Sequence, residues 1–166
     1  MLNMDGYRHD VYPCPCPQPP GTSLWLNSSG HLFGRAGLAF ANGGYSCPHL
    51  IERGHGMVRS SSSSLRLGPG DMFCLLDDCV VEYEADPRDP WVFSWVHLTG
   101  EAASVVCRQM GFTSAEPWRQ GVQAHKTAKA FADLREDLGR GAEVSPWQVV
   151  ARLYQLVAVA MPRGEM

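Results

Sequence analysis

The sequence has 166 residues, of which 45% are hydrophobic and 19% are charged, enough apolar material for one packed domain. Seventeen Gly and twelve Pro are more than a helical bundle uses, which excludes an architecture of helices alone. The formal net charge of −3 argues against direct contact with nucleic acid, because a chain that binds phosphates by itself carries a basic excess on one face.

We see no targeting or membrane segment in the sequence. The first residues have neither the basic cluster nor the apolar core of a secretory signal. The longest apolar stretch, 149–161, is interrupted by Arg152 and Gln155, so we expect no membrane partner. We therefore predict a cytoplasmic protein whose six cysteines are reduced thiols.

Residues 1–22 form a proline-rich arm with five prolines between Pro13 and Pro20. Proline favours extended backbone and lacks the N–H that the interior of a sheet needs. Two interpretations remain open for this segment. It is either a disordered tail or an arm that lies across a pocket.

Residues 23–100 show the pattern of an antiparallel β domain. Short apolar runs recur about every ten residues and are separated by Gly, Asn and Ser, which is typical of a sandwich or barrel. We interpret Asn27–Gly30 as a turn and the five serines Ser60–Ser64 as the tip of a hairpin. The predicted strands are 24–26, 31–33, 38–40, 45–53, 57–59, 65–67, 72–76, 80–85 and 91–98.

The strand 91–98 has two different faces. Its odd-numbered positions, Trp91, Phe93, Trp95 and His97, share one face, which is large and aromatic. The even-numbered positions place smaller and mainly aliphatic side chains on the other face. This contrast predicts that an aromatic space lies on one side of the strand and a second core on the other.

Residues 101–166 change to the helical period. A helix over 101–110 is predicted to end at Gly111, and a second helix covers 123–138. Ser145 followed by Pro146 predicts the start of a third helix, as a cap residue with proline at the first helical position. Strands first and helices afterwards indicate a β domain with an α appendage.

The block from residue 67 to residue 100 closely resembles the sensor domain of AraC-type transcription regulators. The matching segments, in order and spacing, are 67–73 (LGPGDMF), 83–86 (YEAD), 89–91 (DPW), 95–97 (WVH) and Gly100. The resemblance implies a small antiparallel cupin (jelly-roll-like) barrel that binds an effector, often a sugar, followed by two or three helices that pair two subunits. It further implies that DNA is bound by a separate carboxy-terminal domain. Because nothing after the third helix matches that domain, the sequence is either a piece of a longer regulator, which we favour, or a regulator that has lost its DNA-binding domain.

The resemblance also suggests residues that contact the effector. Trp95 matches the position whose ring stacks on a sugar, and Tyr83 matches a tyrosine that points inward. Phe93 replaces an inward polar residue, which makes the predicted pocket more apolar and argues against arabinose itself. The family also carries an arginine that holds the sugar, and Arg35 is the nearest candidate. Trp91 is expected to fill the barrel.

Four further polar residues depend on the register of their strands. His49, Arg53, Glu82 and His97 could each reach the barrel interior, because a slip of one residue reverses the face. Of these we include His49 and Glu82 in the predicted ligand-binding set. Glu82 stands at or beside a family histidine position, and it is either a sign of a different ligand class or an exposed charge.

Catalysis and metal binding are not predicted. Cupin enzymes hold a metal with a close His pair and a third His, whereas here Val80-Val81-Glu82 stands where the third would fall. His49 and His55 are six residues apart, so no His-x-His pair exists. We expect no cofactor. The alternative is a cupin-fold enzyme that modifies sugars, of the epimerase or isomerase type, which would depend on Glu82, His49 and His97.

The third helix is predicted to form a homodimer contact. Its apolar stripe is longer than a small barrel needs for cover, and Leu153, Leu156 and Val157 are the residues assigned to the contact. The alternative is that this stripe packs onto the protein's own barrel and second helix. Taken together, the sequence predicts the sensor and dimerisation domain of an AraC-type regulator, with a small-molecule effector and no catalysis.

Overall fold

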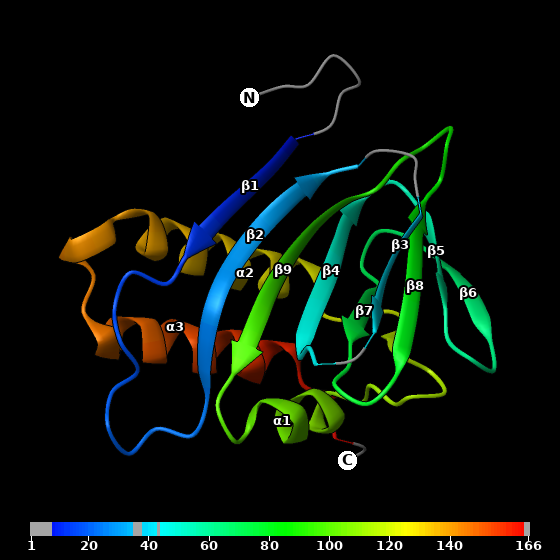
Figure 1. Ribbon diagram of the computed structural model, residues 1–166. Coiled ribbons are helices and arrows are strands. Elements are labelled where there is room, and N and C mark those ends of the chain that lie inside the picture. Colours follow the sequence, from blue (N-terminus) through cyan, green and yellow to red (C-terminus); the bar gives the residue numbers. More distant parts are fainter. Residues whose placement is uncertain (1–7, 35–37, 43, 165–166) are drawn as a thin grey trace.

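The computed structural model describes residues 8–34, 38–42 and 44–164. Within them, antiparallel strand pairs build two sheets (Figure 1). The larger sheet has the order β1 (Arg8–Pro13), β2 (Trp25–Phe33), β9 (Val92–Thr99), β4 (Cys47–Arg53), β7 (Met72–Leu75) and β10 (Trp118–Arg119). The smaller sheet has the order β3 (Leu38–Asn42), β8 (Val80–Ala85), β5 (Gly56–Arg59) and β6 (Ser64–Leu67).

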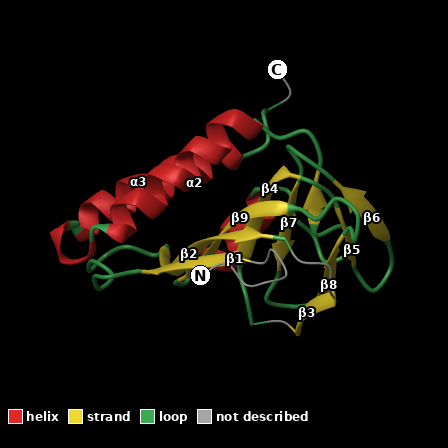
Figure 2. Ribbon diagram, turned by 90° about the horizontal axis from the view of Figure 1, so that it is seen from above, coloured by secondary structure: helices red, strands yellow, loops and turns green. Residues whose placement is uncertain are grey.

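Three helices complete the fold: α1 (Ala103–Gln109), α2 (Ala124–Gly139) and α3 (Pro146–Ala160). A short 3-10 turn, Gly141–Glu143, lies between α2 and α3. Figure 2 shows α2 and α3 side by side on one side of the larger sheet, with the smaller sheet on the other side. The predicted fold class, a small antiparallel barrel followed by helices, is confirmed.

Two separate cores follow from the two faces of the larger sheet. On β9, Val96 and Leu98 pack with the helices, whereas Trp91, just before the strand, and Phe93 pack between the two sheets. Since alternate residues of a strand point to opposite faces, the period-2 pattern of this strand determined both contacts. The aromatic face predicted from the sequence is therefore the face that looks into the space between the sheets.

The first long strand differs from its prediction. The segment Asn27–Gly30, interpreted as a turn, lies inside the continuous strand β2, which pairs with both β1 and β9. A register shift between Leu26 and Ser28 marks a bulge, which accommodates the extra residue. Glycine at position 30 lets the indole of Trp95 lie close to the backbone of β2, because a Cβ there would overlap the ring.

The helix ends agree with their sequence signals. Gly111 follows α1 with a φ of +94°, the left-handed conformation that glycine adopts without strain. The Ser145 hydroxyl accepts a hydrogen bond from the Trp147 backbone N–H at 3.2 Å, as an N-cap residue does. Pro146 then occupies the first helical position.

The residues assigned to a dimer contact are buried inside one chain. Leu153, Leu156 and Val157 all belong to the core between the helices and the larger sheet, and Leu153 is fully buried. Their assignment to a contact between two copies is therefore wrong. The stripe covers the protein's own sheet and second helix, because the outer face of a six-stranded sheet offers more apolar surface than α2 can cover alone.

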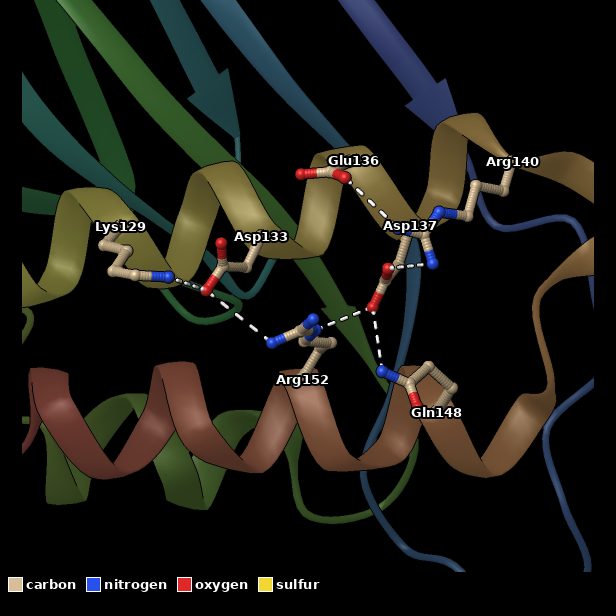
Figure 3. A network of polar contacts seen from close by, with 7 residues as sticks. All are labelled: Lys129, Asp133, Glu136, Asp137, Arg140, Gln148 and Arg152. Carbon is tan, nitrogen blue, oxygen red and sulfur yellow. Dashed lines mark hydrogen bonds and ion pairs between the residues drawn. The ribbon is translucent and has the colours of Figure 1, made fainter.

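A polar cluster joins α2 to α3 (Figure 3). The Asp137 side chain is only 1% exposed, and its carboxylate accepts hydrogen bonds from Arg152 Nε at 2.6 Å and Gln148 Nε2 at 3.2 Å. Arg140 adds an ion pair at 3.3 Å from the same helix. A carboxylate this deeply buried needs such partners, so the cluster determines how the two helices are placed relative to one another.

Candidate ligand-binding site

A cavity of about 210 Å³ lies between the two sheets. Strands of both sheets contribute to its wall, with β8 on one side and β1, β2, β4, β7 and β9 on the other. A cavity of about 150 Å³ holds benzene, so this volume suits a ligand with one ring and a few substituents. The lining residues are His9, Ser28, Leu32, Tyr45, Cys47, His49, Leu75, Tyr83, Phe93, Trp95 and His97.

Four of the five residues predicted to bind a ligand line this cavity: Trp95, Tyr83, Phe93 and His49. Glu82 does not, and its prediction is corrected by the register of β8. Its neighbours Val81 and Tyr83 pack into the core between the sheets, so Glu82 points the opposite way.

The other candidates separate in the same way. His97 lines the cavity, whereas Arg53 ends β4 as an exposed residue outside it. Trp91 is buried among the aromatic rings and is absent from the lining, with its ring stacked on Phe73 at a centroid distance of 5.4 Å. Arg35 lies outside the described residues.

Trp95 is held by two contacts on neighbouring strands. Gly30 is its direct partner on β2, and the missing side chain leaves room for the indole to lie across that strand. The Trp95 indole N–H donates a hydrogen bond of 2.9 Å to Nε2 of His9 on β1. The proline-rich arm therefore contributes an edge strand to the larger sheet and a residue at the rim of the cavity.

His49 is the most deeply buried polar residue in the lining. Its ring stacks on Phe73 at a centroid distance of 4.3 Å and meets the edge of Phe93 at 5.0 Å. Its Nδ1 lies 2.8 Å from the Cys47 carbonyl oxygen. Burial lowers the pKa of His49 to about 3, against the opposing effect of this hydrogen bond, so the ring is neutral near pH 7.

The described lining of the cavity has no formal charge near neutral pH. It contains no Asp, Glu, Lys or Arg, and its ionisable groups are three histidines, two tyrosines and a cysteine. Burial lowers the pKa of His9 and of His97, and burial raises the pKa of the Cys47 thiol. Each of these shifts favours the neutral form, so the site offers hydrogen bonds and aromatic faces to a ligand.

The opposite face of β9 carries a polar contact with α2. Ser94, which stands between Phe93 and Trp95 in the sequence, accepts a hydrogen bond from Arg135 Nη1 at 2.7 Å and donates one to Glu52. His31 Nε2 lies 3.1 Å from the other carboxylate oxygen of Glu52. One strand thus touches the cavity with one face and helix α2 with the other.

Sequence reasoning missed six lining residues: His9, Ser28, Leu32, Tyr45, Cys47 and Leu75. Ser28 and Leu32 were hidden because β2 was interpreted as two strands joined by a turn. Leu75 could have been found, because it alternates with the inward Phe73 on β7. Nothing in the local sequence of the arm indicated that His9 would reach Trp95.

Among the residues that the structure describes, no three His, Cys, Asp or Glu side chains gather in a way that could hold a metal ion. The cysteines in the described residues are free, and Cys47, Cys74 and Cys107 are buried. Each helix among the described residues is too short or too polar to span a lipid bilayer.

A two-sheet barrel with a helical cover and an aromatic cavity whose described lining carries no formal charge is typical of a small-molecule binding domain. Residues 48–157 match the sequence profile of the family described as AraC-like ligand binding domain. This chain therefore belongs to that family, as its motifs predicted. The matched residues include most of the cavity lining and all three helices except the end of α3.

Two regulators of bacterial operons are similar to the chain. The MmsAB operon regulatory protein of Pseudomonas aeruginosa is 30% identical over 95 residues, which are 53% of this chain and 31% of that protein. The Msm operon regulatory protein of Streptococcus mutans is 33% identical over 114 residues, 66% of this chain and 40% of that protein. The chain thus spans about a third to two fifths of the length of these curated relatives.

One solved structure resembles nearly the whole chain. The AraC-like transcriptional activator CuxR superposes with a TM-score of 0.55 at 13% sequence identity, and the match covers 95% of this chain and 64% of that one. At this identity the likeness concerns the fold alone. It extends over both the sheets and the helices, so the arrangement of a barrel followed by packed helices is shared with a regulator.

Proposed function

We propose that this chain is the sensor part of an AraC-type transcription regulator, and that a small-molecule effector, a sugar or sugar derivative, binds in the cavity between the sheets. The observation that carries the proposal is the cavity itself, in which Trp95, Tyr83 and Phe93 surround a space of about 210 Å³. Indole and phenol rings pack well against the flat C–H faces of sugars. The family membership supports a ligand at this place.

The signal would leave the site through β9. A ligand that packs on Phe93 and Trp95 displaces the strand on which Ser94 holds Arg135 of α2. Because interfaces of packed side chains adopt discrete arrangements, such a displacement shifts the population of helix positions. The helices would then change the placement of a DNA-binding domain that lies outside this chain, in the cytoplasm, and this chain itself would not contact DNA.

We favour a sensor over the alternative, a cupin-fold enzyme that modifies sugars. The two curated relatives are named as operon regulatory proteins, which supports a regulatory role for the same fold. A sensor returns its ligand unchanged. Recovery of chemically unaltered ligand after prolonged incubation with the protein supports the sensor function. Conversion of the ligand to an isomer or epimer would refute it and favour the enzyme.

The test of the site is a thermal-shift and tryptophan-fluorescence screen against monosaccharides, oligosaccharides and sugar derivatives. A ligand at about a hundredfold over its Kd stabilises the fold by roughly 2.7 kcal/mol, which raises Tm by about 5–10 °C at this size. We expect Trp95→Ala to weaken such a ligand by about tenfold or more, because it removes the stacking surface. The matched control is Trp147→Ala, since Trp147 is 61% exposed on α3 and does not line the cavity.

A saturating ligand that binds equally well to Trp95→Ala would place the effector elsewhere and refute the site. If no compound of the screen stabilises the folded protein, the proposal that the effector is a sugar or sugar derivative is refuted. Loss of binding in Trp95→Ala with binding retained in Trp147→Ala is the result that supports the proposal.

We also propose that the chain forms a homodimer, through the outward face of α3. With the leucine stripe buried, α3 still presents Tyr154 to solvent, and this large apolar side chain is 46% exposed. Sedimentation velocity should show a dimer for the wild type and a monomer for Tyr154→Arg. Val105→Arg, at an exposed position on α1, is the matched control and should remain dimeric. A monomeric wild type at tens of micromolar would refute the dimer.

A further inference from the structure

The hydrogen bond between His49 and Cys47 determines which ring nitrogen carries the proton. His49 Nδ1 lies 2.8 Å from the Cys47 carbonyl oxygen, which can only accept. Nδ1 is therefore the donor. In a neutral imidazole one nitrogen donates and the other accepts, so Nε2 of this ring is an acceptor.

Several contacts hold this acceptor in place. His49 is 4% exposed, and its ring stacks on Phe73 with an interplanar angle of 13° and meets Phe93 at 73°. Because burial opposes protonation so strongly, the ring stays neutral throughout the physiological range. No hydrogen bond from another described residue satisfies Nε2. An acceptor at a cavity wall that no described residue satisfies favours a ligand that brings a donor.

His49 and Trp95 stand side by side on the cavity wall. They are direct partners on β4 and β9, so their side chains leave the sheet on the same face within a few ångströms of one another. The indole N–H of Trp95 already donates to His9, which leaves the ring face as the part of Trp95 that a ligand meets. One small ligand can therefore touch an apolar face and a fixed acceptor at once.

The charge of the lining restricts the ligand further. The described lining residues include no arginine or lysine for an anion and no carboxylate for a cation. The nearby acidic residue of β4, Glu52, belongs to the opposite face of the sheet, where Ser94 and His31 bind it. Among the described lining residues, a charged group that enters this site finds no oppositely charged side chain to offset the hydration that it loses.

We propose, as an inference that rests on the proposed function, that the site selects an uncharged ligand that combines a flat apolar face with a hydroxyl or N–H donor. The flat face lies against Trp95, and the donor binds Nε2 of His49. A neutral sugar and a hydroxylated aromatic compound share this chemistry. Sugar acids, sugar phosphates and amino sugars do not, and the site rejects them.

The experiment uses two matched series of compounds and measures Kd by ligand-observed NMR and tryptophan fluorescence. The pyranose series is glucose, glucuronate and glucosamine. The aromatic series is benzyl alcohol, toluene, benzoate and benzylamine. We expect the neutral hydroxyl compound of at least one series to bind about tenfold tighter than its charged counterparts, and the series that responds identifies the kind of flat face.

Two variants test the role of the acceptor. His49→Phe keeps a ring against Phe73 and removes Nε2, so binding of the hydroxyl compound should weaken by about tenfold while toluene is unaffected. His49→Gln keeps a neutral acceptor on a side chain of similar reach, so it should recover most of the lost affinity. Circular dichroism and urea unfolding show whether each variant is folded.

Each outcome decides either the inference or the proposed function. Binding that disappears in Trp95→Ala but is equal for neutral and charged compounds overturns the inference and leaves the site standing. Binding of the hydroxyl compound that is unchanged in a folded His49→Phe also overturns the inference alone. Binding that survives Trp95→Ala, or no binding by either series, overturns the proposed site and the inference with it.

Discussion

The contact between Arg152 and Asp137 offers the sharpest test of how the helices are held. Arg152 donates from Nε to the Asp137 carboxylate at 2.6 Å (Figure 3). The Asp137 side chain is 1% exposed. Arg152→Met removes this donor and keeps an apolar stem of similar length. Asp137 then retains Gln148 at 3.2 Å and Arg140 at 3.3 Å. The variant therefore weakens the buried carboxylate's environment without leaving it unpaired.

The expected loss follows from these contacts. A hydrogen bond to a charged group contributes about 1.5–3 kcal/mol, and removal of every partner from a buried charge costs about 3–5 kcal/mol. Because two partners remain, we expect Arg152→Met to lower the free energy of unfolding by about 2 kcal/mol and Tm by about 4–8 °C. Asp137→Asn should lower the free energy of unfolding by a similar amount. The double variant should lose about 2.5 kcal/mol, well below the sum of the two, because both changes remove the same interaction.

Urea unfolding followed by circular dichroism at pH 7 measures these differences. The control is Lys129→Met, which breaks the 2.7 Å pair with Asp133 at a lysine that is 70% exposed and should cost less than about 0.5 kcal/mol. Equal stabilities of Arg152→Met and Lys129→Met would show that the Arg152 hydrogen bond does not stabilise the helix pair. Strict additivity in the double variant would show that the two changes do not remove the same interaction.

The pH dependence of the same pair has a definite sign. Burial opposes ionisation of Asp137, but hydrogen bonds from Arg152 and Gln148 and the charges of Arg152 and Arg140 outweigh it and lower the pKa of Asp137 below its usual value. A lowered carboxyl pKa stabilises the fold above the unfolded-state pKa of about 3.8, and this stabilisation is lost as pH falls through the folded-state pKa. The difference between wild type and Asp137→Asn should therefore shrink below about pH 4.

Three further predictions concern the site and the helix ends. Gly30→Ala should displace the indole of Trp95 and abolish effector binding in fluorescence titrations. The control is Gly139→Ala in α2, where a Cβ has ordinary contacts. It should leave binding unchanged and raise the free energy of unfolding by up to about 1 kcal/mol. The pKa of His49 returns to its ordinary value of about 6.5 only when the protein unfolds, because burial lowers it in the fold. As pH falls below that value the unfolded chain binds a proton that the folded protein does not, so the free energy of unfolding decreases. Between pH 7 and 5 the wild type should lose about 2 kcal/mol more than His49→Phe in urea unfolding, and parallel profiles would contradict this. Ser145→Ala should cost about 1 kcal/mol through the lost cap of α3, and a Tm within 1 °C of wild type would contradict it, since about 2–4 °C is expected.

Most of the local structure follows from residue patterns that lie within a few positions of one another. Alternation along residues 91–98 separated an aromatic face from an aliphatic one, and the structure places Phe93 and Val96 on the two sides accordingly. The cap at Ser145 and the glycine at 111 are signals that act within one turn of chain, and both helix ends follow them. The motifs between residues 67 and 100 were enough to indicate the family, and through it three lining residues of the cavity, Trp95, Tyr83 and Phe93.

Which surfaces meet depends instead on contacts between residues that are far apart in the chain. Glu82 and Tyr83 are adjacent, and the pairing of β8 with β3 and β5 decided which of them faces the cavity. The local sequence around Gly30 indicated a turn. In the structure the glycine is needed because the indole of Trp95, 65 positions later, lies against it. The sequence shows that the stripe of α3 is apolar, which predicts only that some other surface covers it. In the structure the protein's own sheet provides that cover. Register, close approach and burial join residues far apart in the chain, so a local pattern cannot specify them.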